Sequence, residues 1–337
     1  MDDSNPGSLH WPQPKITDSL PEITDPAGYR PAEGLREVVQ TALDLGMPLL
    51  LTGEPGVGKS RLAHWAASQL PGCDEPIEFD VKSTSEARDL LYHYDALADF
   101  RASHRDTAKQ PDRRQFIDYR GLGLAILRAC EEQTVADFVS ERFQHGGQRR
   151  SVVLVDEIDK APRDLPNDLL MEFDRMAFRV PELGGELGQR YIQADEAQRP
   201  LVVITSNSER NLPGAFLRRC VFFHIDSPKG EALAEILDSR LGSLAPAGCP
   251  LRDELLELYH GLRGDPLAHK PGLAELLNAL RALHHLGATA GDSPKARPEW
   301  FSRIAATLAK TVEDNPNFIA LARHHGWQAA QEQGRAR

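Results

Sequence analysis

The sequence predicts an α/β fold in which a doubly wound domain with a five-stranded parallel sheet precedes a smaller, all-helical domain. Five short apolar runs have the length and composition of buried strands, and stretches with helical spacing separate them. After Pro228 the strand pattern ends and only helical patterns follow. The strands are expected at 48–52, 77–81, 152–155, 201–205 and 221–225, and the later helices at 230–241, 251–262, 271–287, 300–312 and 316–331.

The N-terminal 70 residues predict an irregular arm followed by a helix, a strand and a second helix. Residues 1–30 are rich in Pro, Asp and Ser and lack periodicity, so we expect an irregular N-terminal arm that lies against the core. Residues 31–45 predict a helix, because their apolar side chains share one face. A buried strand at 48–52 follows, and 61–70 again has helical spacing.

The chain between the second and third strands is longer than a single crossover requires. Residues 101–114 are strongly charged and contain a proline, which predicts an exposed excursion, and 121–129 predicts a helix. After the third strand, 167–176 predicts another helix. The glycines and alternating residues of 180–199 predict a hairpin.

Residues Gly53–Ser60 read GEPGVGKS, which fits G-x-x-x-x-G-K-[ST] between a strand and a helix. Glycines in such a loop let backbone N–H groups turn toward phosphate oxygens, and the helix N-terminus adds partial positive charge. We expect Lys59 to reach the β- and γ-phosphates and Ser60 to ligate Mg²⁺. The residues expected to contact the nucleotide are Gly53, Glu54, Pro55, Gly56, Val57, Gly58, Lys59, Ser60 and Arg61.

A second motif follows the third strand. The apolar run 152–155 ends in Asp156 and Glu157, at the carboxyl edge where ligands bind in open α/β sheets. Asp156 is placed to hold Mg²⁺, and Glu157 to orient and polarise an attacking water. The alternative is a strand that ends in a solvated acidic turn. The upstream phosphate loop favours the metal and water site.

Polar residues after the fourth strand suggest two further roles. Asn207 is a candidate to bond the γ-phosphate or the lytic water, and its alternative is a turn-forming residue. Arg218 and Arg219 precede the fifth strand, where an arginine can act as a finger on a neighbouring subunit's nucleotide. Their alternative is a solvated basic helix end.

Composition narrows the classes of function. The chain has 337 residues and a formal net charge of −11, which argues against sequence-independent nucleic-acid binding as the main task. Its four cysteines are scattered without C-x-x-C spacing, so we expect neither a zinc site nor a disulfide framework. No secretory leader or membrane-spanning run is visible, and a cytoplasmic location is expected.

Together these motifs resemble the AAA+ ATPases, and within them the MoxR-like family, over roughly residues 30–290. Gly53–Ser60 corresponds to Walker A and Leu154–Asp159 to Walker B. The stretches DEIDKAP at 156–162 and LPGAFLRR at 212–219 are also typical of this family.

The resemblance implies ATP and Mg²⁺ as ligands and a ring homo-oligomer, commonly a hexamer, with nucleotide between subunits. It makes Asn207 sensor 1 and Arg219 the first candidate for the finger, with Arg218 second. It places an insertion at 83–125 and a hairpin at 180–199, within a nucleotide-binding domain at 31–228 that precedes a helical lid and C-terminal helices at 229–337.

The chain departs from the family pattern at sensor 2, where an arginine often begins a lid helix. Here the nearest cation is Lys270, with Arg263 further off, and a lysine supplies a point charge without a guanidinium fork. Lys270 is therefore a candidate nucleotide contact. The alternative is a lysine that merely precedes a helix-starting Pro271.

Three functions remain open from the sequence. The first is an ATPase that remodels or activates a partner protein, since family members often work with a partner that has a von Willebrand factor A domain. The second is a switch that assembles with ATP and recruits an effector. The third is a nucleic-acid motor, which the acidic charge disfavours. The client, the pathway and the size of the ring are not specified by these motifs.

Overall fold

The computed structural model describes residues 25–73, 75–105, 111–242, 244–264, 267, 269–311, 314–324 and 326–327. Most of the expected N-terminal arm, residues 1–24, lies outside the described residues. The same holds for 106–110 of the charged stretch and for the end of the last expected helix.

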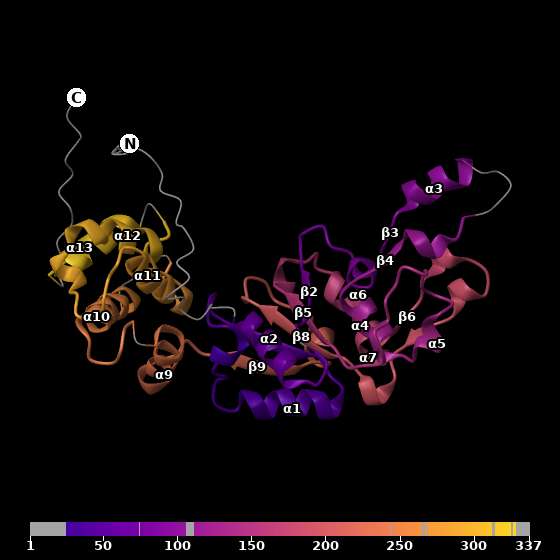
Figure 1. Ribbon diagram of the computed structural model, residues 1–337, viewed down its shortest axis with the longest axis horizontal. Helices are drawn as coiled ribbons and strands as arrows, with labels where there is room; N and C mark the ends of the chain where they lie inside the picture. The colour runs from indigo at the N-terminus through magenta and orange to yellow at the C-terminus, as the bar shows by residue number, and fades with distance from the viewer. Residues whose placement is uncertain are drawn as a thin grey trace, which may run out of the picture.

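The core is one sheet of five parallel strands, as the sequence predicted (Figure 1). Its order is β2-β5-β8-β1-β9, so segments distant in sequence become neighbours. The strands are β1 (Leu49–Gly53), β2 (Ile77–Asp80), β5 (Val152–Asp156), β8 (Leu201–Ser206) and β9 (Val221–Ile225). The three inner strands are almost wholly buried, whereas β2 and β9 at the edges alternate in exposure. This is the pattern expected when helices cover both faces of a parallel sheet.

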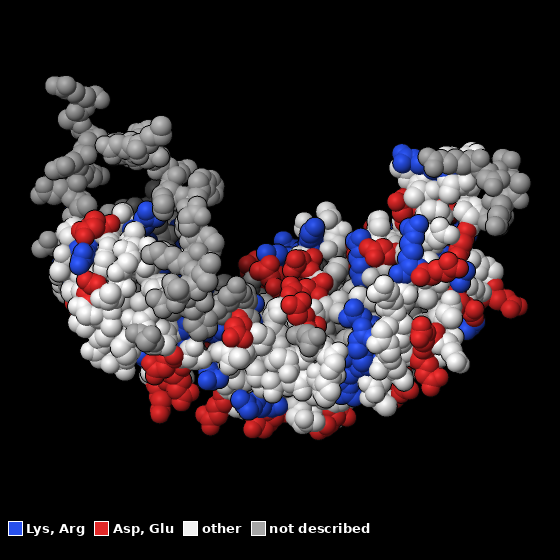
Figure 2. Space-filling view, in the orientation of Figure 1, with Lys and Arg blue, Asp and Glu red and all other residues white. Residues whose placement is uncertain are grey.

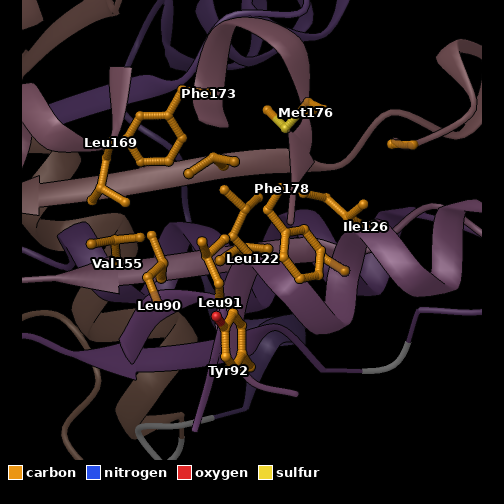
Figure 3. Close-up of a cluster of buried hydrophobic side chains, with 14 of the residues drawn as sticks. Leu90, Leu91, Tyr92, Leu122, Ile126, Val155, Leu169, Phe173, Met176 and Phe178 are labelled. Carbon is orange, nitrogen blue, oxygen red and sulfur yellow. The ribbon is translucent and has the colours of Figure 1, made fainter. Parts of the chain in front are cut away.

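Alternate side chains of the inner strands enter two separate cores. In β5, Val153 and Val155 face one side, and Val152 and Leu154 face the other. The first side packs against α4 and the segments around it, which Figure 3 shows as a cluster that includes Leu122, Ile126 and Val155. The second side packs against α1 and α2. The two cores fix the strand register, because a slip of one residue would exchange them.

The helices around the sheet and two short antiparallel strand pairs complete this part of the chain. The helices are α1 (Leu35–Leu45), α2 (Lys59–Gln69), α3 (Ala96–Arg105), α4 (Gly121–Ala129), α5 (Glu132–Val135), α6 (Leu165–Asp168), α7 (Leu170–Arg175) and α8 (Gly214–Leu217). The strand pairs are β3 (Tyr92–Tyr94) with β4 (Ile117–Tyr119), and β6 (Ala177–Phe178) with β7 (Ile192–Gln193).

Among the described residues after β9, the C-terminal part contains helices and no strand, as predicted, and it has its own core. It lies at the end of the molecule opposite α3 (Figure 1). Leu255, Leu280 and Ile304, each from a different helix, are fully buried in that core. The helices are α9 (Gly230–Leu241), α10 (Pro250–Gly264), α11 (Leu273–His285), α12 (Pro298–Leu308) and α13 (Asp314–His324).

Some elements differ from the sequence-based expectations in their limits. The first helix begins at Leu35 rather than 31, because Gly34 adopts a left-handed conformation with φ 76°. The helix expected at 167–176 is two short helices, α6 and α7. The hairpin expected at 180–199 is reduced to the pairing of β6 with β7, which encloses short 3₁₀ turns instead of continuous strands. Within the described part of the chain, no helix combines the length and apolarity needed to cross a bilayer.

Candidate functional site

The phosphate loop connects β1 to α2 and surrounds the ammonium group of Lys59. Gly56 and Gly58 have φ values of 79° and 98°, which turn the backbone around that group. Lys59 Nζ donates to the carbonyl oxygens of Gly53 at 2.8 Å and Glu54 at 3.0 Å. Its third bond goes to Asn207 Oδ1 at 2.7 Å. Lys59 is only 6% exposed, and burial lowers its pKa, while three nearby carboxylates, of which Asp156 is the strongest, oppose that shift.

Asp156 lies directly across from the start of α2. Its Oδ1 accepts a 2.8 Å hydrogen bond from Ser60 Oγ. It also accepts a hydrogen bond from the hydroxyl of Thr205, because the β5–β8 register pairs Val155 with Ile204 and so brings the next residues together. Carboxylate and hydroxyl oxygens are the hard ligands that Mg²⁺ prefers. Asp156 and Ser60 are therefore fit to hold that ion, with its remaining ligands supplied by phosphate and water.

Glu157 follows Asp156 in a left-handed conformation, with φ 58° and ψ 51°. This conformation is costly for a non-glycine residue and is concentrated at functional sites. The Glu157 N–H donates to Thr205 Oγ1 at 2.9 Å, which stabilises the turn. The carboxylate accepts a 3.0 Å hydrogen bond from Asn207 Nδ2 and another hydrogen bond from Lys160 Nζ. Glu157 is thus held at the carboxyl edge of the sheet by groups from two elements.

Asp159 fixes the turn after β8. Its carboxylate is 3% exposed and accepts from the backbone N–H groups of Asn207, at 3.2 and 3.3 Å, and of Glu209, at 3.0 Å. These bonds set the direction of the Asn207 side chain. Asp159 consequently orients neighbours, and its own oxygens are occupied.

Lys59, Ser60, Asp156, Glu157 and Asn207 line one cavity of about 920 Å³, whereas Asp159 lies behind them and does not line it. A cavity of this volume is within the range of ligand pockets that hold cofactors. Its walls carry both signs of charge, and acidic side chains gather over β2 and β5 on the face shown in Figure 2. The lining includes Asp25, Pro26, Pro55, Gly56, Gly58, Lys59, Ser60, Arg61, His64, Glu75, Glu78, Asp156, Glu157, Thr205, Asn207 and Ala274.

The described end of the N-terminal arm closes one side of this cavity. Asp25 and Pro26 line it, and the ring of Tyr29 lies 6.3 Å from that of Trp65 on α2. Burial raises the pKa of Tyr29. Arg240 of α9 is 5% exposed and donates a 2.9 Å hydrogen bond to the carbonyl oxygen of Asp25. The arm therefore also contacts the C-terminal helices.

Six of the sequence-predicted residues do not line the cavity, namely Gly53, Glu54 and Val57 of the phosphate loop, Arg218, Arg219 and Lys270. Lys270 lines a separate cavity of about 370 Å³ on the other side of the phosphate loop, with Arg263 and Tyr259. Arg218 and Arg219 lie exposed at the end of α8, and Arg219 pairs with Asp174 at 2.9 Å. Lys270 therefore lies outside the cavity that contains Lys59 and Asp156, and it shares its own cavity with Glu54 of the phosphate loop.

The structure also adds residues that the sequence-based reasoning missed. Thr205 contacts both members of the acidic pair, and Ala274 brings α11 to the cavity wall. The signal for Thr205 was present, since it is a polar residue at the carboxyl end of an apolar strand, the edge where ligands bind in open α/β sheets. Ala274 carries no chemical signal and is placed only by the packing of the lid.

The profile of one known protein family matches the part of the chain that contains the site. The family profile of the AAA domain (dynein-related subfamily) matches residues 48–220, just over half of the chain. No curated protein matches the chain. The matched range contains the phosphate loop, both acidic residues and Asn207.

Proposed function

Because the chain belongs to the AAA domain family, dynein-related subfamily, we propose that it binds ATP with Mg²⁺ in the cavity described above, hydrolyses it, and uses the cycle to remodel or activate a partner protein. The observation that carries the proposal is the convergence of Lys59, Ser60, Asp156, Glu157 and Asn207 on one cavity. In this proposal residues 31–228 form the nucleotide-binding domain and 229–337 the helical lid with the C-terminal helices.

The phosphate loop supplies the binding energy for the triphosphate. The donors of Lys59 already point at three oxygens, and β- and γ-phosphate oxygens would replace the backbone carbonyls among them. Ser60 and Asp156 would hold Mg²⁺, which neutralises phosphate charge and offsets the acidic wall of the cavity. The first turn of α2 adds N–H donors.

Glu157 is the group placed to activate water. Its carboxylate reaches the cavity and is held by Asn207 and Lys160, so its position is fixed before substrate arrives. A carboxylate in this position accepts the proton of the attacking water. Asn207 touches both Lys59 and Glu157, which suits a residue that reports the γ-phosphate to the catalytic base.

The proposal includes a ring, hexameric in the MoxR-like manner by the stated resemblance, in which each site is completed by a neighbouring subunit. Arg219, or secondarily Arg218, serves as the finger. Arg219 is exposed and does not line the cavity of its own subunit, which supports a role on another subunit's nucleotide. The partner is a protein client, for which a component with a von Willebrand factor A domain is the first candidate. The acidic net charge of −11 supports a protein client over nucleic acid.

The test uses Glu157→Gln, which keeps shape and removes the base. We expect retained ATP binding with turnover reduced by about 100-fold or more. The variant is purified with ATP from its native cell, and co-purifying proteins are identified. Glu132→Gln, a change at an exposed carboxylate on α5, is the matched control.

The possible results separate the alternatives. Turnover that survives Glu157→Gln contradicts the assignment of the base, and a protein that stays monomeric with ATP contradicts the ring. A variant that traps an active output state with its partner favours the switch, in which hydrolysis only resets the assembly. A variant that loses output favours the remodelling ATPase.

A further inference from the structure

The carboxylate of Glu54 is a meeting point of three parts of the molecule. Glu54 belongs to the phosphate loop, and its two oxygens accept from Arg263 Nη2 of α10 at 2.9 and 3.2 Å. The hydroxyl of Ser227, in the connection between β9 and α9, donates to the same carboxylate. The loop, the connection and the lid are therefore tied together at one side chain.

Arg263 is itself held in place for this contact. Its Nη1 donates 2.9 Å to the carbonyl oxygen of Pro271, just before α11 begins. Its guanidinium carbon lies 5.8 Å from the ring centre of Tyr259. The side chain is only 16% exposed, although Glu54 is 52% exposed. An arginine already held by these two contacts loses little freedom when it binds the carboxylate.

The start of α11 also packs directly on the phosphate loop. A Cβ added to Gly272 would lie 2.9 Å from the carbonyl oxygen of Pro55, and one added to Gly56 would lie 2.9 Å from the Cβ of Ala274. Neither position has room for a larger residue. Because Ala274 lines the nucleotide cavity, the position of α11 determines how far that cavity opens.

The Glu54 carboxylate is held in the ionised form that pairs with Arg263. The hydrogen bond from Ser227 lowers the pKa of Glu54, and Arg263 adds to the shift, while partial burial opposes it. The carboxylate is thus ionised at neutral pH and available as the acceptor for Arg263.

We propose that the Glu54–Arg263 ion pair is a latch that holds the lid against the phosphate loop, and that Arg263 is a positioning residue for nucleotide retention. The inference rests on the proposed ATP site. With the latch formed, α11 stays on the loop and Ala274 closes the cavity wall. With the latch open, the lid moves away and nucleotide leaves faster.

The test compares Arg263→Gln, Glu54→Gln and the double variant. Each single change is expected to raise the dissociation constant of a fluorescent ATP analogue and the KM for ATP by about three- to tenfold, with kcat changed about twofold or less. In the double variant the effects should not multiply, since both changes remove the same contact. Amide hydrogen exchange at the phosphate loop and the start of α11 should rise in each variant without nucleotide.

Arg297→Gln is the matched control in the lid. Arg297 pairs with Asp292 at 2.8 Å and lies over the ring of Trp300, so it has a carboxylate partner and a ring contact like those of Arg263, but it lines neither cavity beside the phosphate loop. It should leave nucleotide affinity and exchange at the loop unchanged.

Two results would overturn the latch. One is an Arg263→Gln protein with wild-type hydrogen exchange at the loop and at α11. The other is a wild-type protein that binds the ATP analogue while Arg263→Gln binds it equally well. A wild type that binds no nucleotide, with exchange still raised in the variants, removes the proposed ATP site but supports the contact between lid and loop.

Discussion

Lys59 Nζ donates a 2.7 Å hydrogen bond to Asn207 Oδ1, across 148 positions of sequence. The amide nitrogen of the same Asn207 donates 3.0 Å to Glu157. One side chain thus joins the phosphate-binding lysine to the candidate base. The contact exists because β1 and β8 are neighbours in the sheet, and Thr52 pairs with Ser206. Phosphate binding and base position are therefore linked by a single amide.

Asn207→Ala tests this link. We expect kcat to fall by about 10- to 100-fold, because the base loses a donor that fixes its position, whereas the KM for ATP should change by about threefold or less. Steady-state ATP hydrolysis measures both quantities. Asn211→Ala, at an exposed amide on the same loop, is the control and should behave as wild type. An Asn207→Ala enzyme with unchanged kcat would show that the amide does not act on Glu157.

Thr205→Val removes a buried hydroxyl with little change in volume. Thr205 is fully buried, donates to Asp156 and accepts from the Glu157 N–H, so the valine leaves that N–H without its acceptor. We expect a loss of about 1–2 kcal/mol in the free energy of unfolding, measured with urea, and a fall in kcat of about tenfold. Thr41→Val, on the exposed side of α1, should cost about 0.5 kcal/mol or less. Equal stability of the two variants would contradict the role given to Thr205.

The Glu54 contact predicts a specific pH dependence of stability. The pKa of Glu54 in the folded protein lies below its ordinary value of 4.5, chiefly because of Ser227 and then Arg263. Such a group contributes stability above its unfolded pKa, and that stability is lost as pH falls through the folded pKa. The difference in unfolding free energy between wild type and Glu54→Gln should therefore be constant near neutral pH and shrink below about pH 4.5.

Chemical denaturation at a series of pH values measures that difference, and Glu132→Gln serves as the control on a carboxylate exposed on α5. A Glu54→Gln difference that grows as the solution is acidified would have the wrong sign and contradict the ion pair.

If Arg219 acts as the finger on a neighbouring subunit's nucleotide, two inactive variants should complement each other. Glu157→Gln lacks the base and Arg219→Ala lacks the finger, and each alone should lose most ATP turnover. In a mixed ring, an intact Glu157 in one subunit can face an intact Arg219 in the next, so mixing should restore measurable hydrolysis. Arg218→Ala, at the adjacent exposed arginine, should need no complementation if Arg219 is the finger. Absence of recovery in assembled mixtures would place the finger elsewhere.

Local sequence patterns were sufficient for the sheet and for the main polar groups of the site. The five strands could be predicted because continuous apolar runs leave few other structures of that length. The phosphate loop and the acidic pair could be located because their residue types and their strand and helix context are specific. The contacts of Asp159 with the backbone after β8 could not be located, because they depend on how two strand ends meet.

The contacts between the lid and the phosphate loop could not be predicted from the sequence, and the reason is physical. Lys270 is closest in sequence to the expected lid helix, and Arg263 is seven positions earlier. The structure nevertheless directs Arg263 to the phosphate loop, because α10 and α11 pack so that its guanidinium reaches Glu54 and Pro271. Proximity in sequence does not determine which side chain of a two-helix corner faces a neighbouring loop.

The strand order has a consequence for how the protein is made. β1 pairs with β8 and β9, which are both synthesised long after it. While a ribosome is still translating the residues before 201, the first strand has neither of its sheet neighbours, and its unpaired backbone N–H and C=O groups, next to apolar side chains, are open to pairing with other chains. A chain released before residue 201 would carry the complete phosphate-loop sequence and still lack β8 and β9, the two neighbours of β1 in the sheet, so termination there is expected to yield aggregated protein instead of a partly active fragment.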